Sequence, residues 1–298
     1  MIQIMKSFEY FAPQSFKDAA SLLHRYGSKA TLLAGGTDLS LRLERRVVEP
    51  GVVVDLKKIR ALRGVKLNRQ GLTIGALTLM DEIASSPSIK ARYAIIADAA
   101  AVVGSIQTRN RATVGGNLCN ASPAADTAPP LIALAACARI ASSRRQREVP
   151  LEEFFVGPGK TCLQPSELLK EIFIPATALK SGSSFQRCTR TAMDIALVNC
   201  AVFLSLASKQ EMVRDVRIAL GAVAPTPVRA ESAETFLIGK VADRDAIEKA
   251  AEVAAGGVSP IDDVRSSASY RREMVRVLTR RALEEALNQA RGKRTNER

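Results

Sequence analysis

The first sixty residues alternate between short apolar runs and a segment with helical periodicity. Ser15 precedes residues 16–26, in which apolar side chains recur at helical spacing, and Gly27 follows them. This pattern predicts an amphipathic helix that is capped by Ser15 and ends at Gly27. Strands are predicted at residues 8–13, 30–34 and 51–56, the second of them buried, and a short helix at 39–45. We therefore predict a small βαββ-like subdomain over residues 1–60.

The next stretch predicts a larger unit in which helices outnumber strands. Residues 71–76 alternate apolar and polar side chains, which predicts a strand, and residues 95–103 form a strongly apolar helical pattern. Further predictions are helices at 80–85, 88–93 and 131–136, a linking segment at 105–111, a hairpin of 138–141 with 148–151, and a strand at 171–174. Residues 61–176 would form a second subdomain and complete a domain over residues 1–176.

Small and polar residues at 175–183 predict a linker to a separate domain. Beyond it, apolar runs at residues 184–187, 196–207 and 213–223 predict an antiparallel sheet. Helices are predicted at residues 230–237, 243–254 and 269–290. We expect an α+β domain over residues 184–290, followed by a basic tail over residues 291–298.

Two stretches each place a pair of glycines after an apolar run and a polar side chain beside them. The first reads Leu32-Leu33-Ala34-Gly35-Gly36-Thr37-Asp38-Leu39, and the second begins Thr113-Val114-Gly115-Gly116-Asn117 and runs to Asp126. Glycine admits positive φ and lets main-chain N–H groups approach anionic oxygens closely, and a helix start just after the turn adds a favourable dipole. An isolated pair would mark only a tight turn. Two pairs suggest one ligand with two phosphates.

Length and composition are those of an ordinary folded protein with room for two domains. The chain has 298 residues, 47% of them apolar, and no apolar run approaches the length of about 20 residues that crosses a bilayer. The first thirteen residues lack a basic start followed by an apolar core. We therefore predict a cytoplasmic protein without a transmembrane segment.

The formal net charge of +13 raises the question of an acidic partner. Nucleic-acid binding is disfavoured because aromatic residues make only 4% of the chain, Trp is absent and the basic clusters are dispersed. Basic faces more often favour solubility or contact with an acidic protein. One hypothesis places Arg271, Arg272 and Arg276, on the C-terminal helix, at such a docking surface.

Several kinds of chemistry find no support in the sequence. The five cysteines include no C-x-x-C pair, and His24 is the single histidine, so neither a zinc site nor an iron–sulfur cluster is predicted in this chain. Gly159-Lys160-Thr161 ends like a P-loop, but Phe154 stands where the motif requires glycine. The sequence also lacks G-x-S-x-G and G-x-G-x-x-G.

Taken together, the two glycine motifs resemble the FAD-pyrophosphate motifs of the flavin-carrying medium subunit of molybdenum hydroxylases, a family that includes carbon monoxide dehydrogenase and xanthine dehydrogenase types. The resemblance extends from Phe8 to the helix that contains Arg272. It implies an α+β protein, with a two-subdomain FAD-binding domain of the vanillyl-alcohol-oxidase/PCMH type followed by an α+β C-terminal domain that has an antiparallel sheet and helices.

The resemblance also implies which residues contact FAD. Arg187 stands where the family usually has lysine, which leaves its contact open because guanidinium and ammonium differ in geometry. Arg190 is a candidate to lie near the flavin ring and favour its reduced anion, although both arginines could equally lie on a solvated strand edge. The implied FAD-binding residues are Leu32, Leu33, Ala34, Gly35, Gly36, Thr37, Asp38, Leu39, Val103, Thr113, Val114, Gly115, Gly116, Asn117, Asp126, Lys160, Leu169, Arg187 and Arg190.

By the same resemblance, the chain is expected to be an electron-transfer subunit rather than the site of substrate oxidation. A large subunit with a molybdenum cofactor would oxidise the substrate, a small subunit with two [2Fe–2S] clusters would pass on the electrons, and FAD in this chain would deliver them to an external acceptor. A dimer of heterotrimers is expected. Two alternatives stay open: a stand-alone FAD oxidoreductase with its own substrate, and a scaffold that binds no flavin.

Overall fold

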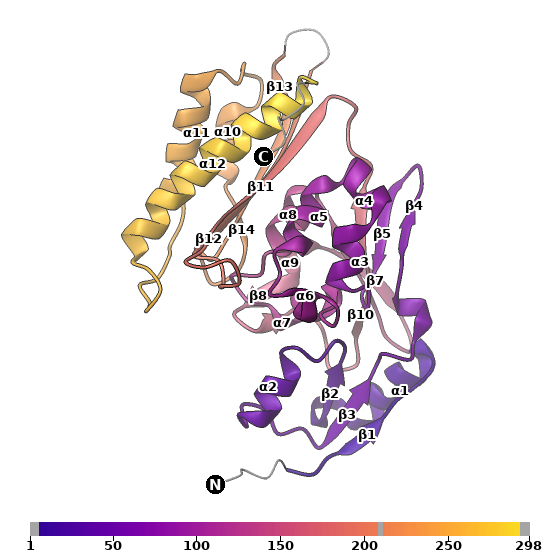
Figure 1. Ribbon diagram of the computed structural model, residues 1–298. Coiled ribbons are helices and arrows are strands. Elements are labelled where there is room, and N and C mark those ends of the chain that lie inside the picture. The colour runs from indigo at the N-terminus through magenta and orange to yellow at the C-terminus, as the bar shows by residue number, and fades with distance from the viewer. Residues whose placement is uncertain (1–5, 208–210, 293–298) are drawn as a thin grey trace.

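Three lobes follow one another along the chain in the computed structural model, which describes residues 6–207 and 211–292 (Figure 1). The N-terminal lobe is a parallel sheet with the strand order β1-β3-β2. A helix separates each strand from the next in sequence, so the arrangement is βαβαβ and the predicted βαββ order is wrong. Its elements are β1 (Glu9–Phe11), α1 (Phe16–Tyr26), η1 (Gly27–Lys29), β2 (Ala30–Leu33), α2 (Leu39–Glu44) and β3 (Val52–Asp55).

The local sequence signals in the N-terminal lobe predicted the ends of α1 correctly but not the burial of β2. The Ser15 hydroxyl accepts a hydrogen bond from the Asp18 N–H at 3.1 Å, and Gly27 follows α1 with φ of 51°, so the predicted cap and stop are confirmed. All four residues of β3 are buried because that strand is central. Strand β2, predicted to be buried, is only half-buried because it lies at the edge of the sheet.

The middle lobe packs helices against an antiparallel sheet with the order β4-β5-β10-β6-β7. Pro87 occupies the first turn of α4, where its missing N–H costs no hydrogen bond, which confirms the predicted break. The segment predicted as a plain link contains the short helix α6. The elements are η2 (Arg60–Leu62), β4 (Val65–Leu67), β5 (Gly71–Gly75), α3 (Met80–Ser85), α4 (Pro87–Arg92), α5 (Ala94–Ala101), α6 (Ile106–Arg109), α7 (Val114–Asn120), α8 (Ala128–Ala133), β6 (Cys137–Ala141), β7 (Gln146–Pro150), α9 (Leu151–Phe154), β8 (Phe155–Gly157), β9 (Lys160–Thr161) and β10 (Leu168–Pro175).

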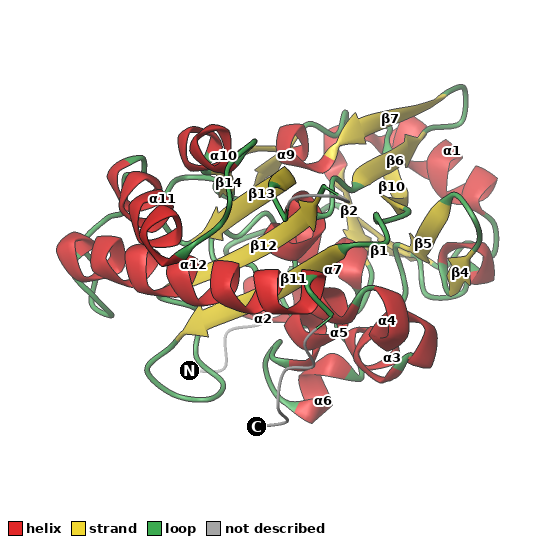
Figure 2. Cartoon of the chain, turned by 90° about the horizontal axis from the view of Figure 1, so that it is seen from above, coloured by secondary structure: helices red, strands yellow, loops and turns green. Residues whose placement is uncertain are grey.

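The C-terminal lobe is an antiparallel sheet with the order β11-β12-β13-β14, and its longest helix runs along one face (Figure 2). The predicted linker is shorter than expected, because β10 extends to Pro175 and β11 already begins at Ser181. The elements are β11 (Ser181–Cys188), β12 (Val198–Leu206), β13 (Val213–Gly221), β14 (Val228–Arg229), α10 (Glu231–Leu237), α11 (Arg244–Gly256) and α12 (Ala268–Ala290). The predicted tail falls largely on residues 293–298, outside the described residues.

Strand β12 joins two hydrophobic cores. All nine of its residues are buried. Ala201 and Phe203 pack into the core of the middle lobe, whereas Cys200 and Val202 pack into the core beneath the C-terminal helices. Successive side chains of a strand point to opposite faces, so a strand covered on both sides becomes uniformly apolar. The C-terminal sheet is thus packed directly onto the middle lobe.

Candidate functional site

A groove with a cavity volume of about 670 Å³ runs between the N-terminal and middle lobes. It collects both glycine motifs, together with apolar side chains from the middle lobe. Thirteen of the nineteen residues expected to bind FAD line it: Leu32, Ala34, Gly35, Gly36, Thr37, Asp38, Leu39, Val103, Thr113, Gly115, Gly116, Asn117 and Leu169.

Folding brings the two motifs into direct contact. A Cβ atom on Gly116 would lie 3.8 Å from the Cβ of Ala34. The side-chain amide of Asn120, at the end of α7, donates to the Asp38 carboxylate at 3.2 Å. Gly35 lies so close to the Arg111 carbonyl oxygen that a Cβ on it would come within 2.0 Å of that atom. The seam between the two lobes therefore passes through the glycine pairs.

The first motif presents free hydrogen-bond donors. Gly36 has φ of 85°, which L side chains rarely adopt, and the chain turns there into α2. Among the described residues, the main-chain N–H groups of Gly36, Thr37 and Asp38 have no acceptor. Gly36 and Thr37 are half-buried, where N–H groups normally find a partner, and Asp38 is exposed, so three consecutive free donors lining a groove suit an anion.

The second motif differs from the prediction. Gly115 and Gly116 lie in the first turn of α7, not in a turn with positive φ. The Gly115 N–H donates to the Ala76 carbonyl at 2.8 Å, and the Gly116 N–H donates to the Thr113 hydroxyl at 3.0 Å. These two N–H groups are therefore already satisfied. The absence of a side chain at Gly115 instead allows α7 to pack closely against Ala76, since a Cβ on Gly115 would lie 2.6 Å from the Ala76 oxygen.

Asp126, at the end of the second motif, does not line the groove. The residue is 8% exposed, and its carboxylate pairs with the Arg187 guanidinium at 3.2 Å and accepts from the Asn199 amide at 3.0 Å. Burial raises the pKa of Asp126 to about 6, against the opposing effects of Arg187 and the Asn199 hydrogen bond. Asn117, which does line the groove, accepts a hydrogen bond from the Thr127 hydroxyl at 2.6 Å.

Five other expected residues also lie outside the lining of the groove. Leu33 packs beside Gly36, and Val114 is buried in the core. Lys160 is exposed on the β8–β9 hairpin. Arg187 donates to the Val102 carbonyl at 3.2 Å, next to groove-lining Val103. The fifth, Arg190, belongs to the loop between β11 and β12.

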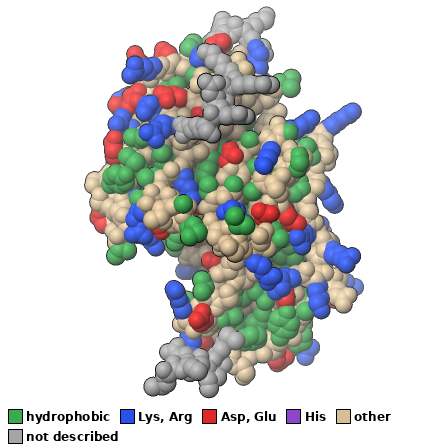
Figure 3. Space-filling model, viewed as in Figure 1, with side chains coloured by type: hydrophobic (Ala, Val, Ile, Leu, Met, Phe, Trp, Pro, Cys, Tyr) green, Lys and Arg blue, Asp and Glu red, His purple; other side chains and the backbone are tan. Residues whose placement is uncertain are grey.

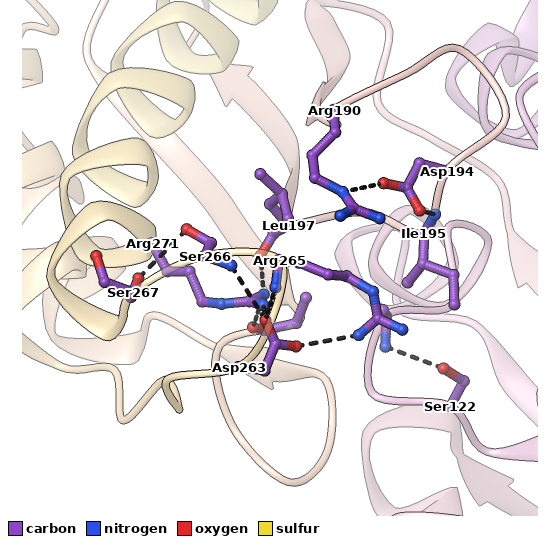
Figure 4. Close-up of polar contacts among 12 residues, drawn as sticks. Ser122, Arg190, Asp194, Ile195, Leu197, Asp263, Arg265, Ser266, Ser267 and Arg271 are labelled. Atoms are coloured by element: carbon purple, nitrogen blue, oxygen red, sulfur yellow. Dashed lines mark hydrogen bonds and ion pairs between the residues drawn. The ribbon is translucent and has the colours of Figure 1, made fainter.

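That loop is held by an ion pair between two of its own residues (Figure 4). Arg190 pairs with Asp194 at 2.5 Å, and Arg187 donates to the Asp194 carbonyl. The neighbouring carboxylate of Asp263 accepts from the Arg271 side chain at 2.8 Å and from main-chain N–H groups. Burial alone would raise the pKa of Asp263, but these donors outweigh burial and lower it to about 2. Arg190 thus carries a neutralised charge beside this cluster.

The same contacts correct the docking hypothesis for Arg271 and Arg276, whereas Arg272 is exposed and stays a candidate. Arg271 is 4% exposed and donates to the Leu197 carbonyl at 2.6 Å, so it fastens α12 to the start of β12. Arg276 is paired with Glu248 and Glu273. An arginine buried or paired in this way offers little net charge to a partner.

Sequence reasoning missed several residues that line the groove. Arg42 follows Asp38 by one helical turn, and that spacing could have indicated it. Cys119 and Asn120 lie inside the second motif, on α7, but were not among the expected FAD-binding residues. Ala76 and Leu163 come from segments without any ligand motif, and only the folded chain places them there.

Within residues 6–207 and 211–292, no three His, Cys, Asp or Glu side chains gather as a metal-binding group. No helix in this part of the chain is long and apolar enough to cross a membrane.

Comparisons with known families agree with both parts of the fold. A family described as the FAD binding domain in molybdopterin dehydrogenase matches residues 6–177. The CO dehydrogenase flavoprotein C-terminal domain matches residues 183–286. The fold and groove are thus those of a flavoprotein with an FAD-binding domain and a distinct C-terminal domain.

Individual relatives narrow the class of flavoprotein to which the chain belongs. The carbon monoxide dehydrogenase medium chain of Hydrogenophaga pseudoflava is 35% identical over 94% of this chain and 96% of the relative. The xanthine dehydrogenase FAD-binding subunit of Escherichia coli O157:H7 is 31% identical over 95% of this chain and 97% of the relative. A solved carbon monoxide dehydrogenase of Hydrogenophaga pseudoflava superimposes with a TM-score of 0.91 at 36% identity, over 95% of this chain and 98% of that one. The chain belongs to the family of FAD-binding medium subunits of molybdopterin dehydrogenases.

Proposed function

We propose that the groove between the N-terminal and middle lobes binds FAD and that the chain acts as an electron-transfer subunit. The observation that carries this proposal is the meeting of both glycine motifs in one groove, with free donors on one side and a tightly packed surface on the other. The cavity volume of about 670 Å³ lies in the range of pockets that hold cofactors, roughly 300 to 1,000 Å³.

The residues present fit such a cofactor. The N–H groups of Gly36, Thr37 and Asp38 would hold the diphosphate. Gly115 would keep α7 close to Ala76, since a Cβ there would lie 2.6 Å from the Ala76 oxygen, and Gly116 would leave the wall of the groove beside Ala34 without a side chain. Val103 and Leu169 would make apolar contacts. When bound, FAD supplies a group that accepts and releases electrons, while the protein binds and orients it.

Removing the glycine geometry tests flavin binding. The double variant Gly36→Val, Gly116→Val should lose the yellow flavin while keeping its far-ultraviolet circular dichroism, and the unmodified chain should release FAD on heating. Gly256→Ala is a matched control, because no atom lies within 4 Å of a Cβ at that position. A full flavin complement in the double variant, or release of FMN or of no flavin, would overturn the proposal.

The proposal also covers the path that electrons take to and from FAD. Electrons would come from a small [2Fe–2S] subunit and pass through FAD to an external acceptor, while a large molybdenum-cofactor subunit oxidises the substrate. The similar proteins are named as a medium chain and an FAD-binding subunit, which supports a role within a larger assembly. We likewise propose a dimer of heterotrimers in the cytoplasm.

Reduction of the purified chain distinguishes this role from a stand-alone oxidoreductase. Flavin in the isolated chain should stay oxidised with candidate substrates and bleach only when the two partner subunits are added. Direct bleaching by a substrate without partners would favour the stand-alone enzyme instead. Co-purified complex should contain molybdenum and iron, and their absence would count against the assembly.

A further inference from the structure

A second hollow lies on the other side of the seam from the flavin groove. Its cavity volume is about 720 Å³, and four residues line both spaces: Ala34, Gly35, Leu77 and Thr113. The Gly35 main chain packs against the Arg111 carbonyl beside this shared wall. The second one is built from the N-terminal lobe, the connecting segment 57–63 and the middle lobe. Apart from Ala34, Gly35 and Thr113, none of its lining residues has an FAD-binding role given above.

Its lining is strongly cationic. Five of its fourteen residues are Lys or Arg and none is Asp or Glu, whereas the whole chain has 43 Lys or Arg among 298 residues. Two of the five are neutralised: Lys57 pairs with Asp55 at 2.9 Å, and Arg63 pairs with Glu82 at 2.7 Å. The other three converge on the hollow without an acidic partner in the described part of the chain: Lys58, Arg60 and Arg111.

Their arrangement creates a local excess of positive charge inside a concave surface, where the field is stronger than on an open face. Basic side chains are widespread on the face of the protein that Figure 3 shows, so charge alone would indicate only a solvated surface. The concavity and the composition of its floor set this cluster apart.

The floor is apolar. Ile59 and Leu77 are almost fully buried beneath the hollow and Leu79 is half-buried, while the exposed amides of Gln14 and Asn110 stand at its edge. An apolar floor with a few polar groups and cations at the rim is the usual composition of a small-molecule site, and the volume is in the same range. A flat docking surface for another protein would have no need of this depth.

We propose that this second hollow binds a nucleoside phosphate. The base would lie against the half-buried side chain of Leu79, the amides of Gln14 and Asn110 would offer hydrogen bonds, and the phosphates would meet Lys58, Arg60 and Arg111. The ligand would touch both lobes beside the glycine seam. The proposal goes beyond FAD binding and does not depend on it.

Calorimetric titration of the FAD-loaded full chain with ATP tests the site. Flavin absorption first shows that the groove is filled, so ATP cannot be measured there instead. We expect one ATP per chain. The double variant Lys58→Glu, Arg60→Glu should weaken ATP binding by at least about tenfold, because two attractive charges become repulsive. Both side chains are exposed, so this variant should keep its melting temperature and its flavin.

A matched control separates the site from total charge. Lys66→Glu, Arg144→Glu makes the same change in net charge at two exposed positions outside the hollow and should leave ATP affinity within about twofold. Inorganic tripolyphosphate should bind at least about tenfold more weakly than ATP, because it has nothing to place on the apolar floor. No ATP binding to the flavin-loaded chain, equal losses in both variants, or equal affinity for ATP and tripolyphosphate would each overturn the assignment. A chain that holds no flavin would instead refute the proposed function.

Discussion

The two glycine motifs look alike in sequence and differ in structure. In the first, Gly36 takes a positive φ and the N–H groups that follow it are free. In the second, both glycines are helical and their N–H groups are bonded within the protein. Similar sequences thus perform two tasks: the first motif supplies free donors, and the second lets α7 pack closely against Ala76 of its own lobe.

The difference teaches that a glycine can be required for its neighbours as much as for its own dihedral angles. Gly35 and Gly115 each face a carbonyl oxygen of another segment, at distances that leave no room for a Cβ. Gly36 instead needs glycine for its backbone conformation. Substitutions to alanine should separate these reasons.

The largest effect is expected for Gly35→Ala. The new Cβ would lie 2.0 Å from the Arg111 carbonyl oxygen, and main chain cannot rotate aside as a flexible side chain can. We expect a loss of about 3 kcal/mol in the free energy of unfolding. The affinity for FAD should fall by roughly a hundredfold, because the two motifs are forced apart. Urea denaturation and flavin titration measure both, with Gly256→Ala as the neutral control. A variant that unfolds and binds FAD like its parent would show that the seam is not tight.

Asp126 should give the second motif a pH dependence of stability. Burial raises its pKa from 3.8 to about 6, so the folded chain holds the proton more firmly than the unfolded chain does. The contribution of Asp126 to the free energy of unfolding is therefore complete below about pH 4 and is lost as the pH rises through about 6. Relative to Asp126→Asn, the parent should lose about 2 kcal/mol of unfolding free energy between pH 4 and pH 7.

Urea midpoints of the parent and the Asp126→Asn variant across this range provide the measurement. Asp263→Asn is a control of opposite sign, since the pKa of Asp263 is lowered to about 2 and its contribution is lost only as the pH falls below about 4. A constant difference between the parent and Asp126→Asn from pH 4 to pH 7 would contradict the buried carboxylate.

Gly36→Ala and Gly116→Ala should sharpen the comparison directly. Alanine at Gly36 must adopt φ of 85° at a cost of about 1 to 2 kcal/mol, or rotate the free N–H groups away. FAD affinity should drop by roughly tenfold. Alanine at Gly116 approaches the Thr113 hydroxyl to 2.9 Å, makes an ordinary contact with Ala34 at 3.8 Å, and gains helix propensity of about 1 kcal/mol. Flavin titration should therefore give Gly36→Ala a much lower FAD affinity than Gly116→Ala. The reverse order would show that the first motif does not supply the donors.

Thr113→Val is expected to have the smallest effect. The variant keeps the side-chain shape but removes the hydroxyl that accepts from the Gly116 N–H and caps α7, which costs about 1 kcal/mol. FAD affinity should change only a few-fold, roughly in proportion to this loss of stability. Thermal unfolding monitors the loss, and Thr113→Ser should restore the cap. Equal destabilisation by serine would point to lost packing rather than a lost cap.

The sequence predicted the elements well where a local signal was strong. Ser15, Gly27 and Pro87 each act within one helical turn, and the helix boundaries they predicted are confirmed. Predictions failed where a distant segment decides the outcome. Strand β2 lost its expected burial because it lies at a sheet edge, and Arg271 is buried because the start of β12 packs over it.

The residues of the candidate site also divide into those that a local signal predicted and those that distant segments decide. The glycine pairs could be found because they are contiguous in sequence, and thirteen of the nineteen expected residues line one groove. Asp126 and Arg187 could not be placed, since their mutual ion pair and the Asn199 contact join three segments. The contributions of Ala76 and Leu163 carried no local signal at all.

By itself, the sequence determined the alternation of helices and strands, the two glycine pairs and the family, because each depends on residues close together in the chain or on a pattern of residue types. Only the tertiary structure decided which glycine N–H groups are free, which arginines are neutralised and where unpaired cations gather behind the seam. These properties depend on atoms within about 3 Å of each other that belong to segments tens of residues apart, and no local pattern encodes such contacts.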